Sequence, residues 1–73
     1  MSPTVAELIA MLHHGVEMTA DVGLMNSSQV LNLALACAEG PAESRLTLEN
    51  YSHLDEEELR RIANAGKGKV TFR

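Results

Sequence analysis

The stretch Arg45-Leu46-Thr47-Leu48-Glu49 alternates polar and apolar residues without a break, and Lys69-Val70-Thr71-Phe72-Arg73 repeats the same pattern. Because successive side chains of a β-strand point to opposite faces of a sheet, this alternation predicts two strands that are each buried on one face. A shorter alternation, Val16-Glu17-Met18-Thr19, predicts a third strand earlier in the sequence. The sequence therefore predicts a sheet with one covered and one open face.

A helix is predicted ahead of each strand, and each helix begins with a capping box, in which two side chains three residues apart bond each other's backbone amides. The three pairs are Thr4 with Glu7, Asn26 with Gln29, and Asp55 with Glu58. A glycine, which readily adopts the backbone conformation that ends a helix, follows each segment. The predicted helices run from Thr4 to His14, from Ser27 to Glu39, and from the Asp55 cap to Gly66 or Gly68.

The order of the elements, helix then strand three times, predicts one small α/β domain over residues 1–73. Strands joined through helices are normally parallel with right-handed crossovers, and repeating one crossover direction keeps every helix on the same side. We therefore expect a three-stranded parallel sheet with helices on one face, which is a short α/β solenoid. The alternative is an α+β domain with a mixed or antiparallel sheet.

The chain resembles the leucine-rich repeats, whose units also place a strand on a concave face and a helix behind it. The resemblance covers residues 26–73 and rests on Leu46-Thr47-Leu48 with nearby Asn50 and on Val70-Thr71-Phe72. Glu43 and Tyr51 stand where that family places leucine and asparagine. The resemblance implies that the open strand face is an interaction surface for another protein.

The candidate interaction face consists of the polar residues of the three predicted strands. Its members are Glu17, Arg45, Thr47, Glu49, Lys69, Thr71 and Arg73, with Thr19 at its border. A surface of this kind predicts a non-enzymatic protein–protein interaction module or a small regulatory or adaptor protein. The alternative is that these side chains only solvate an open sheet, which requires no binding function.

The predicted helix over residues 27–39 is apolar on almost every side, since Asn32 is the only polar residue between Val30 and Ala38. A helix of this kind is either central in its own domain or covered by another chain. Exposed aliphatic surface marks association. Self-association or a stable protein partner is therefore expected if the helix is not fully buried within the domain.

Charge is distributed unevenly along the sequence, which has a net charge of −4. Residues 1–44 contain acidic residues but no Lys or Arg, and all six basic residues lie from Arg45 onward. The acidic total disfavours nucleic acid as the partner. The second functional hypothesis is a nucleic-acid or acidic-ligand binder that uses the basic C-terminal half, with Arg60, Arg61 and Lys67 as contacts.

We expect no enzyme activity, cofactor or metal. Cys37 lies among alanines in the most apolar helix, whereas a nucleophilic thiol needs an exposed, electropositive surrounding. His13, His14 and His53 lack the spacing of zinc ligands. Gly66-Lys67-Gly68-Lys69 follows a helix, whereas a phosphate-binding loop precedes one.

The single cysteine cannot form an internal disulfide, which fits a reducing, cytoplasmic location. No basic residue precedes the first apolar stretch, and no apolar run approaches the roughly 20 residues that span a bilayer. The sequence therefore predicts neither an export signal nor a membrane anchor.

Overall fold

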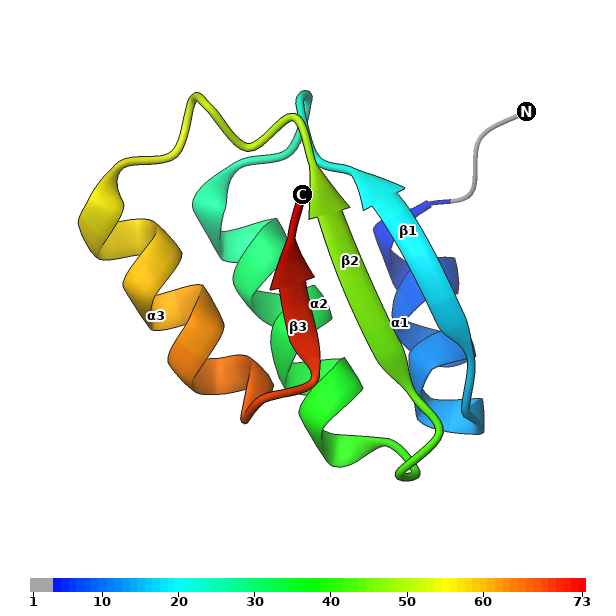
Figure 1. The fold of residues 1–73 in the computed structure, drawn as a ribbon. Coiled ribbons are helices and arrows are strands. Elements are labelled where there is room, and N and C mark those ends of the chain that lie inside the picture. The colour runs from blue at the N-terminus through cyan, green and yellow to red at the C-terminus, as the bar shows by residue number, and fades with distance from the viewer. Residues whose placement is uncertain (1–3) are drawn as a thin grey trace.

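The structure, a computed structural model, describes residues 4–73 and alternates three helices with three strands (Figure 1). In chain order the elements are α1 (Val5–His14), β1 (Glu17–Asp21), α2 (Ser27–Glu39), β2 (Arg45–Glu49), α3 (Glu56–Gly66) and β3 (Val70–Phe72). None of the helices in this part of the chain has the length and apolar character needed to cross a bilayer.

The three strands form one parallel sheet in the order β1-β2-β3. The helices pack behind this sheet on one side, and the other side faces the viewer uncovered in Figure 1. This arrangement confirms the predicted α/β fold with helices on one face. The mixed or antiparallel alternative is wrong. Each helix returns the chain to the end of the sheet at which the previous strand began, so all three strands run in the same direction.

All three predicted capping boxes are present. Asn26 Oδ1 accepts the amide of Gln29 at 2.9 Å, and the Gln29 side chain accepts the amide of Asn26 at 3.0 Å. Asp55 and Glu58 bond in the same way at 2.8 and 3.0 Å. Each box satisfies two amides that have no partner within the helix, which fixes the residue at which the helix begins.

Helix α3 ends at Gly66, one of the two glycines predicted to stop it, and the left-handed conformation falls on the residues after it. Gly66 is the last helical residue, and Lys67 adopts the left-handed conformation with φ 50°, followed by Gly68 with φ 83°. Gly66 also has a packing role, because a Cβ at this position would collide with the Val70 side chain. The helix therefore turns into β3 through two successive residues of positive φ.

The core lies between the sheet and the helices. Helix α2 is central, with α1 on one side and α3 on the other (Figure 1), and it contributes more buried side chains than any other described element. These are Val30, Leu33, Ala34, Ala36 and Cys37. Leu46 and Leu48 of the middle strand are buried beneath α2, with exposed fractions of 1% and 0%. The apolar surface of α2 is therefore buried mainly within the domain.

Candidate functional site

The uncovered face of the sheet presents nine side chains in three rows, each with one residue from β1, one from β2 and one from β3 or the residues directly flanking it. We call this set the open-face grid. Its rows are Glu17–Arg45–Lys69, Thr19–Thr47–Thr71 and Asp21–Glu49–Arg73. Lys69 and Arg73 lie one residue outside β3, and their backbone groups still bond to β2 at Leu46 and Leu48. The register of the parallel sheet therefore aligns all three rows.

The structure places all seven sequence-predicted face residues in the open-face grid. Thr19, expected at the border, lies in the middle row opposite Thr47. Asp21 was missed, because the first strand was expected to end at Thr19 but continues for two more residues. The signal was present in the sequence, since Ala20 and Asp21 extend the same apolar and polar alternation.

All three residues of the row Asp21–Glu49–Arg73, the upper row in Figure 1, have partners. Asp21 Oδ1 accepts the backbone amide of Gly23 at 2.9 Å, and Asp21 Oδ2 accepts Asn50 Nδ2 at 2.7 Å. These two hydrogen bonds lower the pKa of Asp21, with the Gly23 amide as the larger cause. Arg73 Nε lies 3.5 Å from Glu49 Oε2 in an ion pair across β2 and β3.

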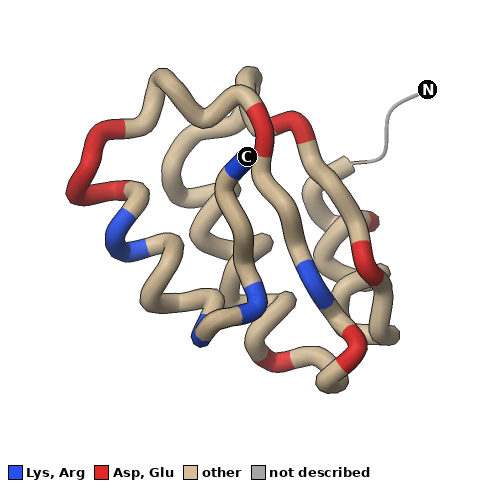
Figure 2. The backbone as a smooth tube through the Cα atoms, in the orientation of Figure 1, with Lys and Arg blue, Asp and Glu red and all other residues tan. Residues whose placement is uncertain are grey.

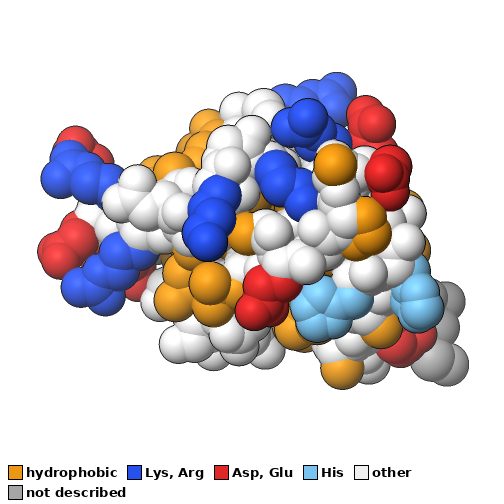
Figure 3. Space-filling view, turned by 90° about the horizontal axis from the view of Figure 1, so that it is seen from below, with side chains coloured by type: hydrophobic (Ala, Val, Ile, Leu, Met, Phe, Trp, Pro, Cys, Tyr) orange, Lys and Arg blue, Asp and Glu red, His pale blue; other side chains and the backbone are white. Residues whose placement is uncertain are grey.

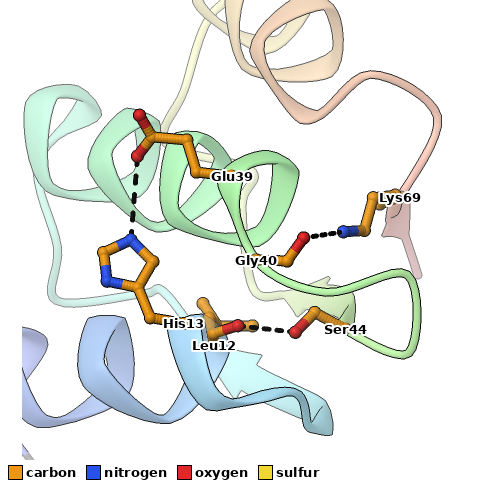
Figure 4. A network of polar contacts seen from close by, with 6 residues as sticks. All are labelled: Leu12, His13, Glu39, Gly40, Ser44 and Lys69. Atoms are coloured by element: carbon orange, nitrogen blue, oxygen red, sulfur yellow. Dashed lines mark hydrogen bonds and ion pairs between the residues drawn. The ribbon is translucent and has the colours of Figure 1, made fainter.

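Lys69 sits at the lower border of the open-face grid and is tied to the end of α2 (Figure 4). Its Nζ donates to the carbonyl oxygens of Gly40 at 3.2 Å and Pro41 at 2.8 Å. A lysine at this position satisfies carbonyls that have no partner within the helix and suits the negative end of the helix dipole. Lys69 is therefore held in place by the scaffold.

Ser44 is the buried polar residue of the core, and it joins the helical layer to the sheet (Figure 4). Its Oγ donates to the Leu12 carbonyl oxygen at 2.5 Å and accepts the amide of Val16 at 3.3 Å. Nearby, His13 Nε2 lies 3.7 Å from Glu39 Oε1. This network connects the ends of α1 and α2 and serves packing rather than ligand binding.

Cys37 is fully buried, and its Sγ lies 3.7 Å from the Lys69 carbonyl oxygen. Burial raises the pKa of the Cys37 thiol, and the positive charges of Lys69 and Arg45 offset part of that rise. His53 Nε2 lies 2.7 Å from the carbonyl oxygen of Met25. Within residues 4–73, no three side chains of His, Cys, Asp or Glu come together as metal ligands.

The basic residues of the C-terminal half do not form one continuous patch. Figure 2 shows Lys and Arg in separate places on α3, near the lower ends of β2 and β3, and at the upper end of β3. Arg60 pairs with Glu56 at 3.0 Å and Arg61 with Glu57 at 3.1 Å, as their spacing on the helix predicts. The lower end, seen in Figure 3, mixes basic with acidic and histidine side chains.

A shallow hollow of about 90 Å³ lies between α2 and α3. Its lining consists of Ser27, Ser28, Leu31, Glu58, Arg61 and Ile62. Small-molecule sites usually enclose roughly 300–1,000 Å³, so this hollow is too small for most metabolites.

Comparison with protein-family models, with curated proteins and with solved structures found no match for this chain.

Proposed function

We propose that the protein is a non-enzymatic interaction module, built like a short leucine-rich repeat, that binds a partner protein on the open-face grid. One observation carries the proposal. Three aligned rows of polar and charged side chains stand on a face of the sheet that no described element covers. The partner that suits this face presents hydroxyl or amide groups opposite the threonine row and charges of both signs on either side.

The centre of the open-face grid has little side-chain freedom to lose on binding. Its middle row consists of three threonines, whose branched side chains have restricted χ1 angles. Thr47 and Glu49 in the central strand are half-buried among their neighbours. A surface whose side chains are already ordered loses less entropy when a partner binds.

The sheet face is favoured over the helical face as the binding surface. Most apolar side chains of α2 point inward, which leaves Leu35 exposed by 42% and Met11 of α1 by 44%. Two partly exposed side chains are ordinary for a monomeric protein and do not make an extended apolar patch. Binding through α1 and α2 therefore has less support than binding through the strands.

The non-enzymatic part of the proposal is supported by the placement of the reactive residues. Cys37 is fully buried and burial raises its pKa, while His13 and His14 end α1 and His53 lies in the loop before α3. A nucleophile needs a base within hydrogen-bonding distance. The hydrogen-bond partners of the Cys37 thiol and the His53 ring are backbone carbonyl oxygens.

A photo-crosslinking experiment in the native cell tests the binding face. A benzophenone amino acid is placed at Thr47, in the centre of the open-face grid, and in a matched variant at Asn32, which is exposed on α2. We expect position 47 to crosslink one protein reproducibly and position 32 to give background only. Equal crosslinking from both positions, or crosslinking from position 32 alone, would contradict the proposal.

Substitution then tests the contact with the purified partner. Thr47→Arg places a long charged side chain in the middle row, where we expect it to weaken binding at least tenfold. Asn32→Arg adds the same charge on α2 and should leave the affinity unchanged. Circular dichroism of both variants separates lost binding from lost folding.

The second hypothesis, a nucleic-acid or acidic-ligand binder, is distinguished by salt. Contacts between basic residues and phosphates weaken steeply as salt rises, because bound counterions are released. A triple change of Arg60, Arg61 and Lys67 to alanine would then reduce binding. If binding is salt-sensitive, resistant to Thr47→Arg and lost in the triple variant, the second hypothesis replaces the first.

A further inference from the structure

Both edges of the sheet are open. The outer edge of β1 belongs to Glu17, Thr19 and Asp21, because Met18 and Ala20 carry the backbone groups that bond to β2 in this register. The outer edge of β3 belongs to Val70 and Phe72, because Leu46 N donates to Lys69 O and Arg73 N donates to Leu48 O on the inner side. An unpaired parallel edge is a template for a further strand.

The two edges carry opposite charges. In the rows Glu17–Arg45–Lys69 and Asp21–Glu49–Arg73, the residue at the β1 edge is acidic and the residue at the β3 edge is basic. Figure 2 shows this separation, with red segments along β1 and blue segments along β3. The middle row ends in threonine at both edges.

The covered face indicates that each edge lacks a neighbour. In the middle strand, Leu46 and Leu48 are buried to an exposed fraction of 1% or less. Of their four register partners in the same apolar layer, Ala20 is buried with an exposed fraction of 6%, whereas Met18, Val70 and Phe72 are half-buried. The difference arises because β2 has a strand on both sides, whereas β1 and β3 have a strand on one.

We propose that copies of this chain associate head to tail, with the β1 edge of one copy paired in parallel beside the β3 edge of the next. The sheet continues across the junction with its internal register. Thr71 then lies opposite Thr19 of the next copy, Lys69 opposite Glu17, and Arg73 opposite Asp21. The amides of Val70 and Phe72 donate to the carbonyl oxygens of Glu17 and Thr19 across the junction.

Lys69 and Arg73 each keep hydrogen-bond donors that are not used within the chain. Lys69 Nζ has three hydrogens, and two of them serve Gly40 and Pro41, which leaves one for Glu17 of the next copy. Arg73 uses Nε for Glu49, so its two terminal nitrogens are available for Asp21 of the next copy. Within residues 4–73, Glu17 makes no ion pair.

Charge also excludes the symmetric arrangements. Pairing two β1 edges would bring Glu17 and Asp21 of both copies together, and pairing two β3 edges would bring Lys69 and Arg73 together. Like charges directly opposite each other on neighbouring strands are destabilising. Head-to-tail contacts of one kind produce rings or open filaments rather than closed two-fold dimers.

Disulfide trapping tests the register. Thr19→Cys and Thr71→Cys are made in separate full-length chains, one of them isotope-labelled, and are mixed and oxidised. We expect bonds between positions 19 and 71 to exceed those between like positions at least tenfold. Within one chain these two positions are about 9.6 Å apart across β2, beyond the roughly 7 Å limit for a disulfide, so the double variant should form a ladder of multimers.

The control for trapping is Asn32→Cys, an exposed position on α2 that should form bonds only at the background rate. Bonds between like positions at the same frequency as bonds between 19 and 71 would overturn the head-to-tail proposal. So would a double variant that remains monomeric after oxidation.

Charge reversal gives an independent test by sedimentation. The mass of the native chain should rise with concentration and fall with added salt. Lys69→Glu with Arg73→Glu, and separately Glu17→Lys with Asp21→Lys, should each raise the dissociation constant roughly tenfold or more. Mixing the two variants restores opposite charges at every junction and should restore association. A native chain that stays monomeric at low salt and high concentration would overturn the proposal, as would a mixture that fails to associate while both variants remain folded.

This proposal concerns the strand edges and the proposed function concerns the face, so each can fail alone. Thr47→Arg should leave self-association intact, because Thr47 lies two strands away from the next copy.

Discussion

The Ser44 hydroxyl donates a hydrogen bond to the carbonyl oxygen of Leu12, 32 residues earlier, across 2.5 Å. Ser44 Oγ in turn accepts the amide of Val16 at 3.3 Å, and the next residue, Arg45, donates its amide to the Val16 carbonyl oxygen at 3.0 Å. Through these contacts one buried side chain holds the end of α1, the start of β1 and the start of β2 together. This network positions the first helix–strand pair, α1 and β1, relative to the second, α2 and β2.

Replacing this hydroxyl should destabilise the fold. Ser44→Ala leaves a buried carbonyl and an amide without their partner, which typically costs about 1–3 kcal/mol. We expect the free energy of unfolding, measured with urea, to fall by that amount. Ser28→Ala is the matched control, since Ser28 is exposed, and it should change stability by less than about 0.5 kcal/mol. Equal effects of the two changes would show that the buried hydrogen bonds contribute nothing.

Gly40 should be equally intolerant of a side chain. A Cβ at this position would collide with the Leu12 carbonyl oxygen and would lie 3.0 Å from Ser44 Oγ. Backbone cannot move aside as a flexible side chain can, so Gly40→Ala should cost about 1–3 kcal/mol in thermal or urea unfolding. Gly23→Ala is the comparison, because its nearest neighbour is the Asp21 carboxylate at 3.1 Å, on an exposed loop. A smaller effect at position 40 than at position 23 would contradict this account.

The helix starts and the sheet could be predicted because their signals are local. Asn26 with Gln29, and Asp55 with Glu58, encode their caps within four residues, and the alternation of Arg45–Glu49 encodes a half-buried strand. Parallel pairing followed from the connections. These features depend on neighbours in sequence, so the residues themselves carry the information.

The features that could not be predicted depend on contacts between distant residues. Nothing in the sequence around Ser44 indicates that its hydroxyl bonds the Leu12 carbonyl oxygen. Likewise, nothing around Gly40 indicates that its Cα lies against the same carbonyl. The partner of Lys69 is likewise a helix end 28 residues earlier. The lower border of the open-face grid is therefore fixed by tertiary packing rather than by local pattern.

Cys37 should be unreactive in the folded protein. Its side chain is fully buried, and burial raises the pKa of the thiol, so little thiolate forms at neutral pH. We expect a maleimide to modify Cys37 at a rate limited by unfolding, and to modify it at once in denaturant. Cys37→Ala serves as the blank. Rapid modification without denaturant would show an accessible thiol and would reopen the possibility of a nucleophilic role.

The Asp21 carboxylate makes the stability of the fold depend on pH. Its pKa lies below the ordinary value of 3.8, because the charged form accepts the Gly23 amide and the Asn50 side chain. A carboxyl with a lowered folded-state pKa adds stability above its unfolded pKa and loses that contribution as the pH falls through the folded value.

Asn50 has φ 60°, so Asn50→Gly removes the side chain without adding backbone strain. We expect this change to raise the pKa of Asp21 toward 3.8, as followed by NMR titration of its carboxyl carbon. Ser52→Ala, in the same exposed loop, should leave that titration unaltered. The contribution of the Asp21–Asn50 bond is the effect of Asn50→Gly on stability in the native background minus its effect in the Asp21→Asn background. It should be largest near neutral pH and should be lost as the pH falls through the folded-state pKa of Asp21. A contribution that persists in acid would mean that the uncharged carboxyl holds Asn50 equally well.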